Sequence, residues 1–96
     1  MTAPLRLAPW VSTDDERMLP HLSHFEAKDS ADALVELEKP EHLDVWVVFH
    51  FPDTYRVAKP KAVLYGRMWG FRKRGIDAMV RQLSSGRYVL VVRRYV

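Results

Sequence analysis

The chain has 96 residues, a hydrophobic fraction of 48% and no cysteine. This length predicts a single domain over 1–96, and the composition argues against wholesale disorder. The lack of cysteine excludes a disulfide framework and thiol chemistry. The N-terminal stretch lacks the apolar core of a signal peptide, and no apolar run approaches the roughly 20 residues that cross a bilayer. We therefore expect a cytoplasmic protein without a membrane partner.

The net charge of +3 is the balance of two unlike halves. Residues 1–50 hold four Lys or Arg and ten Asp or Glu, and residues 51–96 hold eleven and two. The net charges of the halves are thus −6 and +9. Such a division is typical of a chain whose basic half binds a polyanion. The alternative is that acidic and basic elements lie side by side and neutralise each other.

The first 21 residues are predicted to form an N-terminal arm with a short helix, ahead of an α+β core over 22–96. Ser12 or Thr13 is the expected N-cap of that helix, over 14–19, and Pro20 ends it. Residues 22–27 are a weak strand candidate. If 18–27 is helical instead, the sheet has three strands.

The rest of the chain alternates between strand-like and helix-like segments. Asp29 or Ser30 caps a predicted helix and Pro40 ends it. Residues 76, 79, 80 and 83 share one face of a second predicted helix, with Gly86 at its C-terminal end. The segments in chain order are a helix over 29–39, a strand over 43–51, a loop over 52–60, a strand over 61–71, a helix over 75–86 and a strand over 87–96.

This order, β-α-β-β-α-β, predicts a ferredoxin-like α+β sandwich. Its four-stranded sheet is antiparallel and both helices cover one face. The strand over 87–96 lies at a sheet edge in this arrangement. An exposed edge invites pairing with another chain, so a homodimer through the C-terminal strand is possible.

Alternation along each predicted strand divides its side chains between two faces. In strand 43–51, one set is apolar and belongs to the core: Val45, Val47, Phe49 and Phe51. The face without helices is expected to display aromatic and cationic side chains: Trp46, His50, Tyr65, Arg67, Trp69, Arg93 and Tyr95. Aromatic side chains flanked by arginines stack unpaired bases while the cations hold phosphates. The alternative is that the N-terminal arm folds back and covers this face.

The basic run Arg72, Lys73 and Arg74 follows at the end of the same strand. Residues 67–74 are similar at four positions to the third-strand signature of the RNA-recognition motif: a basic residue, an aromatic, a glycine and a phenylalanine. The sequence departs from that signature at Met68, Arg72 and Arg74. We therefore do not assign the chain to that family.

Few residues suggest catalysis or metal binding. His21 and His24 have i,i+3 spacing, but no strong zinc spacing is present. No phosphate loop, dinucleotide fingerprint or nucleophile elbow occurs. We expect neither a metal nor a cofactor, and no enzymatic activity.

The sequence favours a small binding module for RNA or single-stranded DNA. Tyr65 and Trp69 would stack bases, and the phosphates would be held by cationic side chains: Arg67, Arg72, Lys73, Arg74 and Arg93. The alternative is a protein-interaction module, such as a regulator, inhibitor or assembly subunit, that uses the same face or the C-terminal edge strand.

Overall fold

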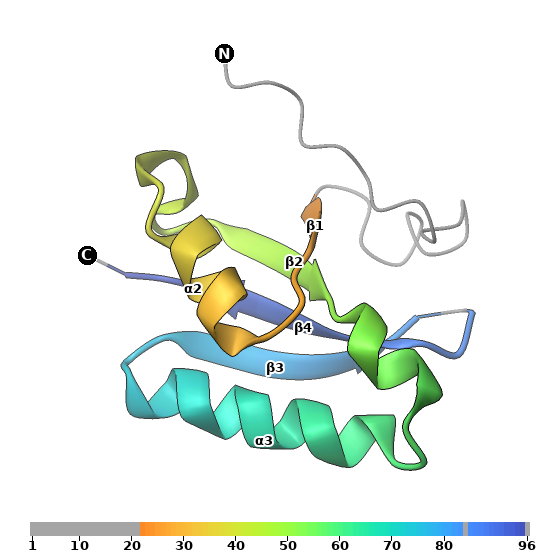
Figure 1. The fold of residues 1–96 in the computed structure, drawn as a ribbon. Helices are drawn as coiled ribbons and strands as arrows, with labels where there is room; N and C mark the ends of the chain where they lie inside the picture. The colour runs from red at the N-terminus through yellow and green to blue at the C-terminus, as the bar shows by residue number, and fades with distance from the viewer. Residues whose placement is uncertain (1–21, 84, 96) are drawn as a thin grey trace.

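The computed structural model describes residues 22–83 and 85–95 (Figure 1). The predicted arm, its short helix and its possible cover of the sheet lie outside the described residues. The elements in chain order are β1 (Ser23–Glu26), α2 (Ser30–Leu37), the 3₁₀ turn η1 (Pro40–His42), β2 (Trp46–His50), the 3₁₀ turn η2 (Pro52–Arg56), α3 (Pro60–Lys73), β3 (Asp77–Gln82) and β4 (Tyr88–Arg93).

The four strands form one mixed sheet in the order β1-β2-β4-β3. β1 runs parallel to β2, while β4 pairs antiparallel with β2 on one side and β3 on the other. The coarse prediction of an α+β domain with four strands and two helices is confirmed. The predicted antiparallel sheet is wrong, and a ferredoxin-like arrangement is not confirmed. The C-terminal strand β4 is central, so it offers no edge for a homodimer.

The order of the elements also differs, because strand and helix are exchanged over residues 60–82. The predicted strand 61–71 is the helix α3, and the predicted helix 75–86 is β3 followed by a turn. Leu64, Met68 and Phe71 are buried at the i, i+4, i+7 spacing of one helix face. Pro60 stands in the first turn, where a fixed φ and a missing N–H favour helix entry. The similarity of 67–74 to a strand signature therefore falls on a helix.

Gly75 ends α3, whereas the sequence pattern predicted it at the start of a helix. Its φ of +79° is in the left-handed region that glycine tolerates best. The N–H of Gly75 donates to the carbonyl of Arg72 at 3.0 Å, and the N–H of Ile76 donates to that of Phe71 at 3.1 Å. This pair of bonds is a Schellman C-cap, and Ile76 and Phe71 both belong to the core. Similarly, Gly86 lies in the turn before β4 with a φ of +94°.

Four other predicted elements are present. β1 pairs with β2, which excludes the three-stranded alternative. Asp29 caps α2, since its side chain accepts a bond from the N–H of Asp32 at 2.8 Å. β2 and β4 lie within the predicted strands 43–51 and 87–96.

Both helices pack on the same face of the sheet. The core on this face includes side chains from α2, α3 and the strands: Ala33, Leu37, Val47, Phe49, Phe51, Leu64, Met68, Phe71, Ala78, Leu90 and Val92. A second cluster, with Val48, Val89 and Val91, lies on the opposite face together with Trp46 and Met79. β2 and β4 are therefore buried on both faces. Val45, which the alternation placed in the core, is 45% exposed because β2 begins only at Trp46.

Figure 1 shows α3 running beside β3 along its length, and the structure packs α3 against both β3 and β4. One side of α3 is thus buried and the other faces outward. No helix in the described part of the chain is long and apolar enough to span a membrane.

Candidate nucleic-acid interface

The outward side of α3 carries two aromatic side chains one turn apart. Tyr65 is 40% exposed and Trp69 is 55% exposed, although both are large and partly apolar. Gly66 and Gly70 lie beside them, and a Cβ placed on either glycine meets open space. The backbone of α3 is therefore accessible between the two rings. We call this surface of Tyr65, Gly66, Trp69 and Gly70, with Lys61 and Lys73 at its ends, the α3 outer face.

The segment around the α3 outer face is uniformly basic. Between Asp53 and Asp77 the chain has seven Lys or Arg and no Asp or Glu. Six of the seven are exposed and form no ion pair with a described acid: Arg56, Lys59, Lys61, Arg72, Lys73 and Arg74. Because no described acid forms an ion pair with them, their charges add to one positive potential.

Arg67, a predicted phosphate contact, lies on another side of α3. Its Nη1 and Nη2 donate to the two carboxylate oxygens of Asp53 at 3.2 and 2.7 Å. Its guanidinium also lies over the Phe51 ring, 4.5 Å from the centroid. The hydrogen bond from Arg67 lowers the pKa of Asp53 below its ordinary value, with a further contribution from the charge of Arg67. These contacts of the Arg67 guanidinium hold η2 against α3, so they compete with the predicted contact to a phosphate.

Arg93, the predicted contact on the last strand, is surrounded by acids and aromatic rings. Its guanidinium lies between Trp46 and Tyr95, 4.8 and 4.5 Å from the ring centroids. It bonds to the Tyr95 hydroxyl, and its Nη2 lies 3.6 Å from a carboxylate oxygen of Asp77. Asp44 is at 4.0 Å. The positive charge of Arg93 is therefore balanced within the fold.

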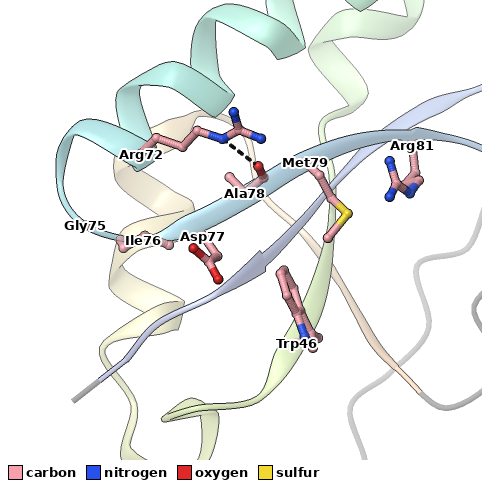
Figure 2. Close-up of a pocket in the computed structure, with 8 residues that line it drawn as sticks. All are labelled: Trp46, Arg72, Gly75, Ile76, Asp77, Ala78, Met79 and Arg81. Atoms are coloured by element: carbon pink, nitrogen blue, oxygen red, sulfur yellow. Dashed lines mark hydrogen bonds between the residues drawn. The ribbon is translucent and has the colours of Figure 1, made fainter.

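Arg72 joins the α3 outer face to the edge of the sheet. Its guanidinium carbon is 5.0 Å from the centroid of the Trp69 ring, close enough for a cation–π contact. Its Nε donates to the carbonyl of Ala78 at 2.9 Å (Figure 2). A neutral carbonyl leaves the charge of Arg72 uncompensated. Two further cations, Lys73 and Arg74, extend the basic surface at this end of α3.

An open groove of about 670 Å³ lies next to Arg72, along the outer edge of β3. Its lining comes from three segments of the chain: Trp46, Arg72, Gly75, Ile76, Asp77, Ala78, Met79 and Arg81. We call it the β3 groove. Sequence reasoning named Trp46 and Arg72 but missed Asp77, Met79 and Arg81, because it placed them on a helix. Only the alternation of a strand brings these three side chains to the face of Trp46.

Three of the four histidines lie in buried contacts: two of them contact each other, and the third contacts a glutamate. His24 Nδ1 and His50 Nε2 are 2.9 Å apart, and both rings are buried between β1 and β2. His42, also buried, has its Nε2 2.8 Å from a carboxylate oxygen of Glu36. His21 lies outside the described residues. No group of three or more metal-ligating side chains occurs among the described residues.

Comparison with protein-family models, curated proteins and solved structures finds no match.

Proposed function

We propose that this chain is a small non-enzymatic binding module that holds single-stranded nucleic acid on the α3 outer face. The observation that carries the proposal is the uniformly basic segment between Asp53 and Asp77, with six exposed cations that no described acid neutralises. Held so close together, these charges repel one another in the free protein. A polyanion that neutralises them releases its own counterions, which favours binding.

The exposed aromatics indicate which polyanion fits. Base stacking on Tyr and Trp stabilises complexes with single strands by about 1–3 kcal/mol per base, whereas the bases of a duplex are already stacked. Tyr65 and Trp69 are one helical turn apart, and Lys61 lies 5.9 Å from the Tyr65 ring centroid. Each exposed ring therefore has a cation beside it that can contact the adjoining phosphate. Gly66 and Gly70 give a base room to approach the backbone.

The proposed interface differs from the sheet face that the sequence predicted. Tyr65, Trp69 and the basic run 72–74 remain in it, but on a helix. Arg67 and Arg93 are left out, because ion pairs hold both of them within the fold. The interface thus consists of one helix face and the turn that follows.

The second candidate is a protein partner on the same surface. The exposed apolar side chains of Val63, Tyr65 and Trp69, with two small residues between them, also suit a packed helix. A second copy of α3 is unfavourable there, because its cations repel those already present. A protein partner on this surface would need an acidic face.

Fluorescence anisotropy with a labelled single-stranded oligonucleotide, measured across a salt series, tests the proposal. Phosphate binding predicts that affinity falls steeply with salt. The double variant Lys73→Gln/Arg74→Gln should reduce the salt slope by about 2, since each lost phosphate contact removes about 1. Trp69→Ala should weaken binding by about tenfold through lost stacking, without changing that slope.

The matched control is Lys28→Gln/Lys39→Gln, which removes two cations from the acidic half of the chain. This variant should retain nearly the full affinity. Absence of binding at low salt contradicts nucleic-acid binding and leaves an acidic protein as the remaining candidate. Equal losses from both double variants contradict a localised interface.

A further inference from the structure

The β3 groove lies at the end of the basic surface. Its lining combines an apolar floor with a cationic side chain toward each end. Trp46 and Met79 are half-buried and form an apolar floor, and Figure 2 shows the Met79 side chain directed toward the indole. Arg72 lies toward one end of the groove and Arg81 toward the other. A volume of about 670 Å³ is within the range of sites that bind small organic groups.

The edge of β3 is unsuited to a strand from another protein. Pairing would use the backbone groups that point away from β4. Two of these carbonyls are already occupied, since Arg72 Nε donates to Ala78 and Arg81 Nη1 donates to Val80 at 3.2 Å. Guanidinium groups along an edge are among the devices that prevent strand addition. The occupant must therefore bind through the side chains of the groove.

Among the described residues that line the groove, Asp77 is the one with a carboxylate. Its Oδ2 accepts from the Tyr95 hydroxyl and lies near Arg93, whereas its Oδ1 has no hydrogen bond with a described residue. Arg93 offsets the negative charge, so a phosphate nearby is tolerated. The free oxygen accepts hydrogen bonds only. It therefore suits an N–H donor on a group that lies flat against Trp46.

We propose that the β3 groove is a base-binding subsite for single-stranded nucleic acid, selective for bases that carry an exocyclic amino group. The base stacks on the Trp46 and Met79 floor, its amino group donates to Asp77, and the flanking phosphates contact Arg72 and Arg81. This inference rests on the proposed function, because the strand reaches the groove from the α3 outer face by way of Arg72. Cytosine and adenine offer such a donor, whereas thymine and uracil present a carbonyl oxygen in its place.

Anisotropy with equal-length oligo(dC), oligo(dA) and oligo(dT) tests the subsite on the full chain. The wild-type protein should bind oligo(dC) at least about tenfold more tightly than oligo(dT), the effect of one hydrogen bond to a charged group. Oligo(dA) should also bind more tightly than oligo(dT). Asp77→Asn should bring the dC/dT affinity ratio close to one, because an amide can also donate to the thymine carbonyl. Arg81→Gln should weaken binding to all three oligonucleotides alike and reduce the salt slope by about 1.

Asp44→Asn is the matched control. It also removes a charge beside Arg93, but it does not line the groove, so the dC/dT ratio should stay at its wild-type value. Thermal unfolding of each variant establishes that it is folded. As an independent readout, the fluorescence of Trp46 in a Trp10→Phe/Trp69→Phe background should be quenched by oligo(dC).

The outcomes separate the two proposals. If oligonucleotides bind with a steep salt dependence but the dC/dT ratio is near one, the subsite is overturned and the proposed function stands. The subsite is also overturned, and the proposed function stands, if Asp77→Asn and Asp44→Asn change the dC/dT ratio equally. The same conclusion follows if oligo(dC) does not quench the fluorescence of Trp46. If no oligonucleotide binds at low salt, both proposals are overturned.

Discussion

The guanidinium of Arg67 and the carboxylate of Asp53 form two parallel hydrogen bonds, with Nη1–Oδ1 at 3.2 Å and Nη2–Oδ2 at 2.7 Å. This fork joins α3 to η2, the turn that follows β2. Bidentate pairs are stronger and more directional than single ion pairs. Arg67 therefore helps to fix the rotation of α3 about its axis, which keeps Tyr65 and Trp69 directed outward.

Asp53→Asn should destabilise the protein at neutral pH by about 0.5–1 kcal/mol, because Asp53 is about half exposed and solvent screens the pair. The pKa of Asp53 is lowered, mainly by its hydrogen bond from Arg67. Its stabilisation is thus complete above the unfolded pKa of about 3.9 and is lost as pH falls through the lower folded pKa. Urea unfolding should show the stabilities of wild type and variant converging as the pH falls through the lowered pKa of Asp53. Glu41→Gln, at an exposed acid outside the ion pairs, should have little effect at any pH.

Gly66→Ala and Gly70→Ala should each stabilise the fold by about 0.5–1 kcal/mol. Both positions are in the interior of α3 with open space for a Cβ, and alanine loses less backbone entropy than glycine in a helix. Gly75→Ala should instead destabilise by about 1 kcal/mol, because its φ of +79° is unfavourable for alanine. Thermal unfolding of the three variants measures the difference. Equal shifts in all three would contradict the assignment of Gly75 as the C-cap glycine.

Leu64→Ala should cost about 2–5 kcal/mol, as is typical of a fully buried leucine in a packed core. Val63→Ala should change stability by less than about 0.5 kcal/mol, because Val63 is exposed on α3. Denaturant unfolding measures both changes. Phe71→Ala, at another buried position of α3, should also cost about 3–5 kcal/mol. This third variant distinguishes the helix from a strand, because in a strand Phe71 would share the face of Val63, opposite Leu64.

The buried pair His24–His50 should contribute to the stability of the fold. His24 Nδ1 and His50 Nε2 lie 2.9 Å apart, and both rings are buried. His50→Ala should destabilise the protein by about 1–3 kcal/mol or more, because a buried nitrogen of His24 loses this hydrogen bond. Denaturant unfolding measures the loss. A variant as stable as the wild type would contradict this role.

Sequence patterns predicted those elements whose local and tertiary preferences agree. Strand 43–51 and strand 87–96 are rich in β-branched residues, and both contain strands buried on two faces. Asp29 is a strong N-cap, and α2 begins directly after it. The excess of positive charge in the second half also followed from the sequence, and the structure places much of it on one helix and the turn after it.

The secondary structure of segment 60–82 was predicted wrongly because its sequence fits both the two-residue period of a strand and the 3.6-residue period of a helix. Residues 63, 65, 67, 69 and 71 alternate as in a strand, while 64, 68 and 71 repeat as in a helix, and Gly66 and Gly70 lower the helix propensity. In β3, Ala78 packs toward the helices and Met79 toward Trp46, so both faces of the strand bear apolar residues. Such a strand does not show the regular alternation of apolar and polar residues that marks a half-buried strand.

The sequence by itself thus determined which side chains are apolar, which are charged and where several elements begin. Only the tertiary structure decided that α3 is a helix, since short helices gain most of their stability from packing. It also decided that β4 is central and that Trp46, Asp77 and Arg81 line one groove. These relationships depend on contacts between residues distant in the chain, and no local pattern contains them.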